Sequence, residues 1–470
     1  MDPFSSASDI ARSIRAGAIS PVDVVELYLS RIDTYNDAVN AIVWRNDDDV
    51  RQAAKAAEAA LGSGGALPFF HGVPMPIKDL VSVSGQPNTR GGLGTSTEPQ
   101  PENDLVVDRI LNAGFLLMGR TNSPEGGMTQ VTENSRYGIT RNPWNLDRTP
   151  AGSSGGASAA VAAGLAPIAS ASDGGGSIRM PASATGLVGL KPSRARVPAK
   201  VLGWEHGTTQ GVVTRTVEDA ARTLDYLSVE DPLGWYRAPT PERPYGDSYT
   251  EAAGPLRIGL MLDAPNGVEV DPICAETAER TARLLEVAGH TVVPVSADFI
   301  STEALRIYST TVIAASLHTV PYDDPSQSEP FIIARRKMAE ELPASEYAKA
   351  VLRLHLECRR MVAHWRRDFD VLVSPTLACQ VPPVGVILAE ANELLDGSSP
   401  REARMLAFNS YANILGLPAI SVPVGTDSDG LPVGAQLVGS PYDETTILRL
   451  AQSLERELDW ASRTPAAFTH

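Results

Sequence analysis

The chain contains two related segments, Gly152-Ser-Ser-Gly-Gly-Ala-Ser158 and Asp173-Gly-Gly-Gly-Ser-Ile-Arg179. Each segment holds a glycine-flanked serine, Ser153 and Ser177, and the two serines lie 24 positions apart. The residues between them, 157–171, fit a helix of small residues followed by a buried strand. The glycines before Ser177 let the backbone approach a ligand closely and turn its N–H groups toward an attacked carbonyl. The pattern therefore predicts a helix–strand unit that carries a nucleophilic serine.

A lysine in an apolar setting lies upstream of these serines. Lys78 ends the stretch Gly72-Val-Pro-Met-Pro-Ile-Lys78 and is one of only six lysines in the chain. Burial disfavours the charged form of an amine and lowers its pKa, which suits a general base. The alternative is a lysine at an exposed strand end that is paired with Asp79. A serine needs a base before it can attack a carbonyl, so the serines favour the first interpretation.

Other glycine-rich motifs match this region less well. The Walker pattern GxxxxGK[ST] is absent, and the Rossmann fingerprint is not met cleanly. Gly152-Ser-Ser-Gly-Gly156 formally matches a nucleophile elbow with Ser154 at its centre. An elbow needs a strand directly before it, whereas Asn142 to Pro150 is loop sequence. A glycine-rich turn without chemistry remains the plain alternative.

Composition excludes several classes of protein. The 470 residues carry a net charge of −16, which disfavours binding to nucleic acid or to anionic membranes. No apolar run approaches the roughly 18 residues of a membrane span, and the N-terminus lacks the features of a signal peptide. Three widely spaced cysteines predict reduced thiols in a cytoplasmic protein. No histidine pattern indicates a metal site, so we expect no metal.

The apolar pattern predicts an α/β fold, because short apolar strands alternate with helices. The first 60 residues are expected to be helical, with one helix beginning at Ser20-Pro21 and another stopping at Gly62-Ser-Gly-Gly65. Asp231 to Pro255 holds five prolines and is expected to be a loop or linker. Further expected elements are strands near 115–119, 256–261, 291–295, 370–376, 419–424 and 434–438, and helices near 106–113, 216–227, 272–288, 300–367 and from 444.

Together these motifs resemble the amidase signature family over nearly the whole chain, from about Ala11 to the last helix. The resemblance is carried, in order, by Gly72-Val-Pro-Met-Pro-Ile-Lys-Asp79, Gly119-Arg-Thr-Asn-Ser-Pro-Glu125, Gly152-Ser-Ser-Gly-Gly156, Asp173-Gly-Gly-Gly-Ser-Ile-Arg179, Gly189-Leu-Lys-Pro-Ser193 and Gly416-Leu-Pro-Ala-Ile-Ser-Val-Pro423. It implies a central mixed, twisted β-sheet covered by helices on both faces. It also implies a single domain over 1–470, made of an N-terminal helical region (1–65), a signature core (66–230), an inserted α/β and helical region (about 256–368) and the C-terminal part of the core (369–470).

The resemblance implies a Ser–cis-Ser–Lys triad. Ser177 matches the nucleophile, Ser153 matches the bridging serine that follows a cis peptide bond, and Lys78 matches the base. The oxyanion hole would be formed by the backbone N–H groups of Gly174, Gly175, Gly176 and Ser177.

Further residues match supporting roles in the family. Gly127, through its backbone carbonyl, and Ser153 match positions beside the substrate. Asp173 and Arg179 match structural supports of the glycine-rich loop. The resemblance implies neither a metal nor an organic cofactor.

The implied function is a serine amidohydrolase that cleaves amides, and by extension carbamates, anilides or esters, through an acyl-enzyme. Within the family the chain is most similar to 6-aminohexanoate cyclic dimer hydrolases, which act on nylon oligomers, in Thr140-Arg-Asn-Pro-Trp-Asn-Leu146, Ser177-Ile-Arg-Met-Pro-Ala-Ser183 and Asp459-Trp-Ala-Ser-Arg-Thr-Pro465. The partner would be a small amide or carbamate (urethane) molecule, and a homodimer is a family expectation. The alternatives are the A subunit of a glutamyl-tRNA amidotransferase, with the same triad, and a non-enzymatic scaffold, which an intact triad disfavours.

The chain departs from the family at two glycine-rich sites. Many members have an apolar residue at Gly174, the first of three consecutive glycines, and relatives often have a larger side chain where this chain has Gly126-Gly127. We expect both departures to widen the acyl site. We expect the pocket itself to be built from the helical region 300–365 and from a loop, 377–405.

Overall fold

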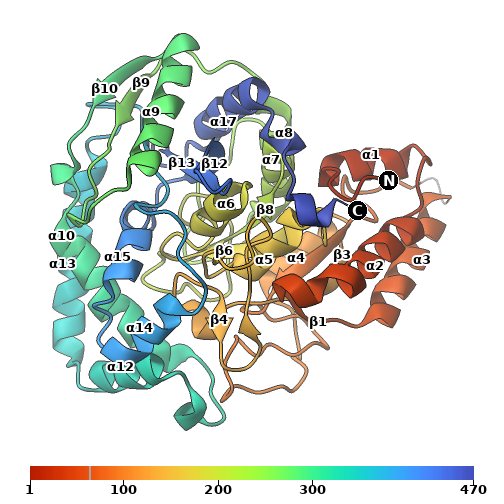
Figure 1. Ribbon diagram of the computed structural model, residues 1–470, viewed down its shortest axis with the longest axis horizontal. Coiled ribbons are helices and arrows are strands. Elements are labelled where there is room, and N and C mark those ends of the chain that lie inside the picture. The colour runs from red at the N-terminus through yellow and green to blue at the C-terminus, as the bar shows by residue number, and fades with distance from the viewer. Residues whose placement is uncertain (63–64, 470) are drawn as a thin grey trace.

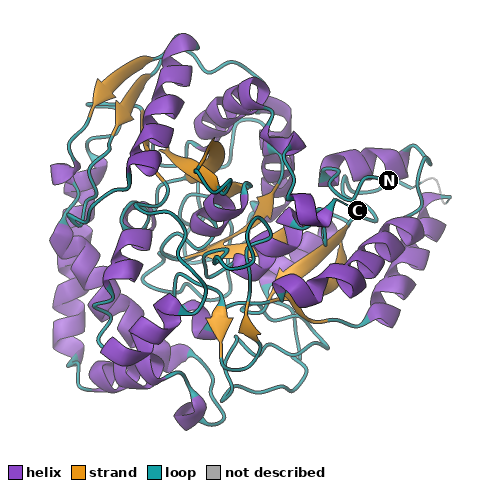
Figure 2. Cartoon of the chain, in the orientation of Figure 1, coloured by secondary structure: helices purple, strands orange, loops and turns teal. Residues whose placement is uncertain are grey.

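The computed structural model describes residues 1–62 and 65–469. Within these residues an eight-stranded sheet forms the centre of the molecule, with a three-stranded and a two-stranded sheet beside it (Figures 1 and 2). The strands of the central sheet are, in spatial order, β10 (Thr291–Pro294), β9 (Arg257–Leu260), β11 (Val371–Pro375), β13 (Pro432–Val438), β12 (Ala419–Thr426), β7 (Val188–Lys191), β8 (Thr209–Thr214) and β6 (Ile168–Asp173). The smaller sheets contain β1 (Ile42–Trp44), β3 (Leu116–Thr121) and β2 (Pro74–Lys78), and β4 (Glu133–Asn134) and β5 (Gly138–Ile139).

The central sheet is mixed, as the resemblance implies. Strands β10, β9 and β11 run parallel to one another, and every neighbouring pair from β11 to β6 is antiparallel. A parallel pair needs a crossover connection, which α9 (Pro272–Val287) supplies between β9 and β10. The strands β12 and β13 instead form an antiparallel pair across the turn at Gly430.

Helices cover both faces of this sheet. Successive side chains of a strand point to opposite faces. On one face of β12, Ile420 and Val422 share a buried cluster with Ile447 and Leu448 of α17 (Glu444–Leu458). The opposite face carries Ser421, and the helix that packs there is α6 (Arg179–Thr185). The predicted layering is therefore confirmed.

The remaining helices lie around this core. In chain order they are α1 (Ala7–Arg15), α2 (Pro21–Val39), α3 (Asp47–Leu61), α4 (Leu105–Asn112), α5 (Gly155–Ala162), α7 (Val217–Leu227), α8 (Tyr245–Ser248), α10 (Thr302–Ile307), α11 (Ala314–Ser316), α12 (Pro330–Glu340), α13 (Ala344–Val362), α14 (Val386–Leu394), α15 (Pro400–Leu406) and α16 (Ser410–Leu415). Short 3-10 helices are η1 (Glu125–Gly127), η2 (Ala297–Phe299), η4 (Leu317–Thr319), η5 (Pro325–Gln327), η6 (Trp460–Ser462) and η7 (Ala466–Phe468), and η3 (Tyr308–Ile313) is a π-helix.

The N-terminal region contains the predicted helices and one strand that was not predicted. The Ser20 side chain caps α2 by accepting a hydrogen bond from the Val22 N–H, and Pro21 occupies the first helical position. The expectation of helices alone is wrong at β1, which pairs antiparallel with β3. A strand of three residues is too short to show a period. Residues 63 and 64 of the predicted helix stop lie outside the described residues.

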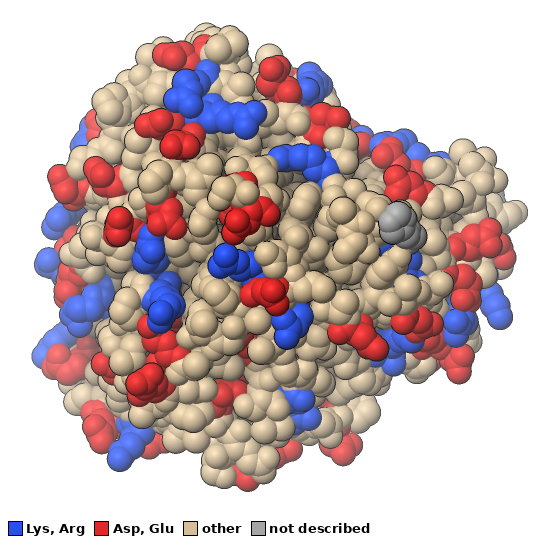
Figure 3. Space-filling model, in the orientation of Figure 1, with Lys and Arg blue, Asp and Glu red and all other residues tan. Residues whose placement is uncertain are grey.

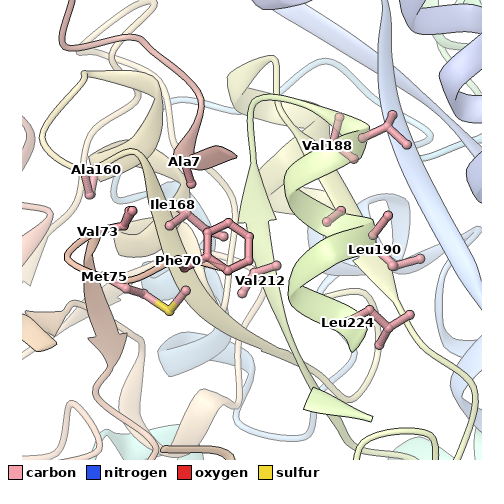
Figure 4. Close-up of a cluster of buried hydrophobic side chains, with 14 of the residues drawn as sticks. Ala7, Phe70, Val73, Met75, Ala160, Ile168, Val188, Leu190, Val212 and Leu224 are labelled. Atoms are coloured by element: carbon pink, nitrogen blue, oxygen red, sulfur yellow. The ribbon is translucent and has the colours of Figure 1, made fainter. Parts of the chain in front are cut away.

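The largest buried cluster joins the N-terminal region to the sheet. The Phe70 ring stacks on Phe115 with centroids 4.4 Å apart. Figure 4 shows the Phe70 ring between Ile168 of β6 and Val212 of β8. Burying one such aromatic or aliphatic side chain is worth about 1.5–3 kcal/mol, so this cluster holds β2 and β6 side by side.

Two segments differ from their predicted structure. Residues 377–405, expected to be a loop, contain α14 and most of α15. The Ser399 side chain caps α15 by accepting from the Glu402 N–H, a local signal that the sequence analysis did not use. The linker after Asp231 is irregular as predicted, apart from the single turn of α8.

The face of the molecule drawn in Figure 3 carries charged side chains of both signs. On the face drawn in Figure 3, Lys and Arg side chains are interspersed with Asp and Glu. Some pair directly, as Arg12 does with Glu218 at 2.8 Å. Among the described helices, none is both long and apolar enough to cross a membrane.

Candidate active site

Strand β2 places Lys78 in the interior. All five residues of β2 are buried, and Lys78 itself is 0% exposed. The strand pairs parallel with β3 and lies against β6. The Lys78 backbone N–H donates to Ser170 Oγ of β6 at 2.9 Å, which ties the end of β2 to that strand. The lysine is therefore held by its backbone as well as by its side chain.

Three serine hydroxyls surround the Lys78 amine. Lys78 Nζ lies 2.8 Å from Ser153 Oγ, 2.8 Å from Ser154 Oγ and 3.0 Å from Ser172 Oγ. Only Ser153 was predicted as a partner. The sequence contains a pattern that could have indicated Ser172. Ser170 and Ser172 are two residues apart in β6, so both side chains point to the same face of the strand, the face that meets Lys78.

Burial lowers the pKa of Lys78 to about 7, although the nearby Asp173 carboxylate opposes the shift. A neutral amine has two N–H donors and one lone pair, so it can donate to only two of its three serine partners and accepts a hydrogen bond from the third. The Ser154 hydroxyl already donates to the Ser172 carbonyl at 3.2 Å. Lys78 can therefore donate to Ser154 and Ser172 and accept a hydrogen bond from the Ser153 hydroxyl.

Ser153 lies on a tightly packed loop before α5. The Gly152–Ser153 peptide bond is cis, as the resemblance implies. A Cβ at Gly152 would lie 2.7 Å from backbone atoms of Val131, and a Cβ at Gly156 would lie 2.5 Å from the Asn122 backbone. Glycine is needed at both positions because the neighbouring atoms belong to the main chain and cannot rotate away. These close approaches fix Ser153 beside the end of β2.

Ser154 does not sit on a nucleophile elbow. It precedes α5 as its N-terminal flanking residue, and the residues before it form a loop rather than a strand. Its hydroxyl contacts Lys78 and the Ser172 carbonyl. The expectation that this segment is not a nucleophile elbow is therefore confirmed. The Ser154 hydroxyl instead belongs to the hydrogen-bond network around Lys78.

The glycine-rich loop follows β6 and is held by a buried ion pair. Asp173 accepts from Arg179 Nε and Nη2, both at 3.0 Å, and both side chains are 0% exposed. Burial alone would raise the pKa of Asp173, but Arg179, Lys191 and the hydrogen bond from Asn413 together outweigh burial and keep the pKa well below its usual range. Asp173 is therefore an anion inside the molecule.

The oxyanion hole predicted from four N–H groups is only partly free. The Gly176 N–H donates to Asp173 Oδ1 at 2.7 Å, so it is already engaged. Within residues 1–62 and 65–469, the N–H groups of Gly174, Gly175 and Ser177 meet no protein acceptor. The neighbouring Ile178 N–H also goes to Asp173, at 3.1 Å. Three of the four predicted donors thus remain available, and Gly176 instead supports the loop.

Ser177 and Gly127 line a cavity of about 250 Å³. Its wall comes from both segments expected to build the pocket, the helical region 300–365 and residues 377–405. The lining residues are Gly127, Met128, Gln130, Gly175, Ser177, Met180, Trp204, Asn266, Leu305, Tyr308, Ser309, Ile313, Arg335, Gly397, Ser398, Ser399, Glu402, Ala403, Leu406, Ala407 and Ser410.

The two glycines do not widen this cavity, contrary to expectation. A Cβ at Gly174 would lie 2.5 Å from Cζ3 of Trp204, so the indole ring fills the space that a side chain would take. A Cβ at Gly127 would lie 2.8 Å from Leu80 Cδ1 and 3.3 Å from Ser153 Oγ. Gly127 also has a φ of +75°, a conformation that favours glycine. Both glycines allow close packing instead.

The rest of the chain offers little metal-binding chemistry. Among the described residues, no three His, Cys, Asp or Glu side chains are grouped so that they could hold a metal ion. The three cysteines are unpaired thiols, in agreement with the prediction.

Comparison with known proteins gives consistent matches over almost the full length. The model of the Amidase family matches residues 23–448. The 6-aminohexanoate-cyclic-dimer hydrolase of Paenarthrobacter ureafaciens is 34% identical over 490 residues, covering 99% of this chain and 97% of that protein. The acylamidase of Rhodococcus erythropolis is 34% identical over 474 residues, covering 98% of this chain and 97% of that protein.

A solved structure agrees with the sequence matches. The structure of 6-aminohexanoate cyclic dimer hydrolase complexed with substrate superposes on this chain with a TM-score of 0.92. It is 31% identical and covers 100% of both chains.

Proposed function

Because this chain belongs to the amidase signature family and is an amidase, a hydrolase of C–N bonds, we propose that it works through Ser177, Ser153 and Lys78. In this proposal Ser177 is the nucleophile, Ser153 relays its proton and Lys78 is the base. The observation that carries the proposal is the 2.8 Å contact between Lys78 Nζ and Ser153 Oγ at a lysine whose pKa is lowered to about 7. A neutral amine at that distance can remove a proton from a hydroxyl.

The first step forms the acyl-enzyme. Lys78 takes the proton of Ser153 while Ser153 takes the proton of Ser177, and Ser177 Oγ forms a bond to the amide carbonyl carbon. The carbonyl electron pair moves to oxygen, where the N–H groups of Gly174, Gly175 and Ser177 donate to the anion. The C–N bond then breaks, and the leaving nitrogen takes a proton from Ser153. Lys78 then returns a proton to Ser153.

The second step releases the acid. Water attacks the Ser177 ester and gives its proton to the same Ser153–Lys78 pair. The tetrahedral intermediate collapses, the bond to Ser177 Oγ breaks, and Ser177 regains its proton. The proposed machinery is thus complete with side chains and backbone groups of this chain.

We propose small amides as substrates, with carbamates, anilides and esters as further candidates. The relatives named for 6-aminohexanoate cyclic dimer and for acyl amides support small acyl amides. The cavity supports the same class, because Leu305, Ile313 and Leu406 are among the residues that line it together with Ser177. Apolar lining residues favour an acyl chain without charge.

Hydrolysis of a four-member panel tests the proposal. The panel is an acyl p-nitroanilide, an aliphatic amide, a carbamate and glutamine, assayed with the wild-type chain and with Ser177→Ala. We expect turnover of the apolar substrates and a loss of at least about 10⁴-fold in kcat for Ser177→Ala, because the nucleophile is gone.

Two results would contradict the proposal. Unchanged turnover in Ser177→Ala would show that another group attacks the amide. Turnover of glutamine alone, or no turnover until a partner protein is added, would favour the glutamyl-tRNA amidotransferase subunit instead.

A further inference from the structure

A buried tyrosine hydroxyl contacts the glycine-rich loop and has no part in the steps above. Tyr308 begins the π-helix η3, and its side chain is 2% exposed. Its hydroxyl donates to the Gly174 carbonyl oxygen at 2.8 Å. The two residues are 134 positions apart, so this bond connects the inserted region to the proposed oxyanion hole.

The bond constrains a catalytic donor through the geometry of the peptide unit. The Gly174 carbonyl and the Gly175 N–H belong to one planar trans peptide, in which they point in opposite directions. Holding the carbonyl toward Tyr308 therefore holds the Gly175 N–H on the opposite side. Gly175 lines the cavity together with Ser177, and among the described residues its N–H group meets no acceptor, so it is free to donate to a bound substrate.

The other two free donors are held in the same way by other groups. The Asp173 carbonyl accepts from Asn413 Nδ2 at 3.0 Å, which orients the Gly174 N–H. The Gly176 carbonyl accepts from the Met180 N–H at 2.7 Å, which orients the Ser177 N–H. Each of the three free N–H groups thus shares a peptide unit with a carbonyl that accepts a hydrogen bond. For the Gly175 N–H, the donor to that carbonyl is the Tyr308 hydroxyl.

Packing fixes the Tyr308 hydroxyl in its place. The Tyr308 ring meets Trp204 edge to face, with centroids 6.4 Å apart at 72°. On the other side, a Cβ at Gly207 would overlap the Tyr308 hydroxyl, so this glycine makes room for it. Burial raises the pKa of Tyr308 above its usual value, so the hydroxyl keeps its proton and remains a donor.

We propose that Tyr308 is a positioning residue that aims the Gly175 N–H at the oxyanion, so that the inserted region completes the oxyanion hole. This inference rests on the proposed function, because it needs an attack by Ser177 that forms an oxyanion. Losing the Tyr308 hydroxyl should therefore weaken binding of the transition state and leave binding of the substrate unchanged. The reason is that the Gly175 N–H bonds most strongly to the oxyanion, which forms only during the reaction.

The test compares Tyr308→Phe with Tyr28→Phe. Both changes delete one buried hydroxyl that donates to a backbone carbonyl, and the Tyr28 hydroxyl bonds Pro3 O at 3.2 Å in the N-terminal region. For each variant we would measure kcat and KM on an acyl p-nitroanilide. We would also measure inhibition by a trifluoromethyl ketone, which forms an oxyanion adduct with serine, and by the matching secondary alcohol, which does not.

We expect Tyr308→Phe to lower kcat by about 10- to 100-fold with KM within about 2-fold, since one oxyanion donor loses its orientation without being deleted. Affinity for the trifluoromethyl ketone should fall by a similar factor, and affinity for the alcohol should not change. Tyr28→Phe should leave all four values unchanged. If Tyr308→Phe does not fold, Gly207→Ala displaces the same hydroxyl and should give the same selective loss.

Equal weakening of both inhibitors, or a kcat equal to that of Tyr28→Phe, would overturn the inference. The Ser177→Ala control separates this failure from failure of the proposed function. If Ser177→Ala is inactive and Tyr308→Phe is normal, only the role of Tyr308 is wrong. If Ser177→Ala is active, the proposed mechanism fails first.

Discussion

Burial decides what the Lys78 amine can do. A lysine in water is protonated near neutral pH and cannot accept a proton, whereas Lys78 is enclosed and its pKa is lowered to about 7. The three serine oxygens around it supply hydrogen bonds without an opposite charge in direct contact. The amine is therefore poised between its two protonation states at neutral pH.

This environment predicts how activity depends on pH. In the proposed mechanism the neutral amine is the base, so kcat/KM should rise with pH through about 7 and reach a plateau above it. Below pH 6 the amine is protonated, and activity should fall by about tenfold per pH unit. Initial rates between pH 5 and 9 on an uncharged amide would check this.

A matched variant tests whether Lys78, rather than another titrating group, causes this pH dependence. Lys78→Arg keeps a cation that stays protonated over this range, so it should be inactive at every pH. A flat wild-type profile, or an active Lys78→Arg enzyme with the same profile, would mean that Lys78 is not the base.

At the scale of elements, close backbone contacts position the reactive groups. Helix α5 approaches the end of β3 so closely that Gly156 touches the Asn122 backbone. The loop before α5 carries Ser153, and the neighbouring strand β2 carries Lys78. The contact between α5 and β3 therefore sets the distance between the serine and the lysine.

Enlarging this contact should damage both stability and activity. In Gly156→Ala the new Cβ would lie 2.5 Å from backbone atoms of Asn122, so α5 must move away. We expect a loss of about 1–3 kcal/mol in the free energy of unfolding, as for other overpacked cores, and a lower kcat. Urea denaturation and p-nitroanilide hydrolysis would measure the two effects.

Gly254→Ala is the control for this change. Gly254 has no heavy atom within 4 Å of its added Cβ and lies in an exposed loop. It should keep wild-type activity and stability within about 0.5 kcal/mol. Equal behaviour of the two variants would refute the packing argument.

At the scale of the whole molecule, the active site depends on segments from both halves of the chain. The central sheet joins β6, β7 and β8, which precede the proline-rich linker, to β11, β12 and β13, which follow it. The central link is the antiparallel pair of β7 with β12. Residues of the linker such as Leu233 and Trp235 are highly exposed and lie outside this sheet.

Cutting the linker should therefore leave the enzyme assembled. A specific protease site inserted after Leu233 should allow complete cleavage while both fragments elute together in size-exclusion chromatography. Activity should stay within about 2-fold of the uncut protein, because surface loops tolerate nicking. Separation of the fragments without denaturant, or loss of activity on cleavage, would contradict this view of the fold.

The sequence by itself determined the features that depend on residue type and local pattern. The motifs around Lys78, Ser153 and Ser177 indicated the family, and the alternation of apolar strands with helices indicated an α/β fold. Helix starts such as Ser20-Pro21 were readable because a cap involves neighbouring residues only. Strand β1 escaped this reasoning because three residues show no period.

Only the tertiary structure decided which groups meet at the site. It brings Ser172 to Lys78 and commits the Gly176 N–H to Asp173. It also fills the space beside Gly174 with Trp204 and places the Tyr308 hydroxyl on the Gly174 carbonyl. Local pattern encodes helices, strands and turns within a few residues, whereas these contacts join segments that only the packing of the whole chain brings together.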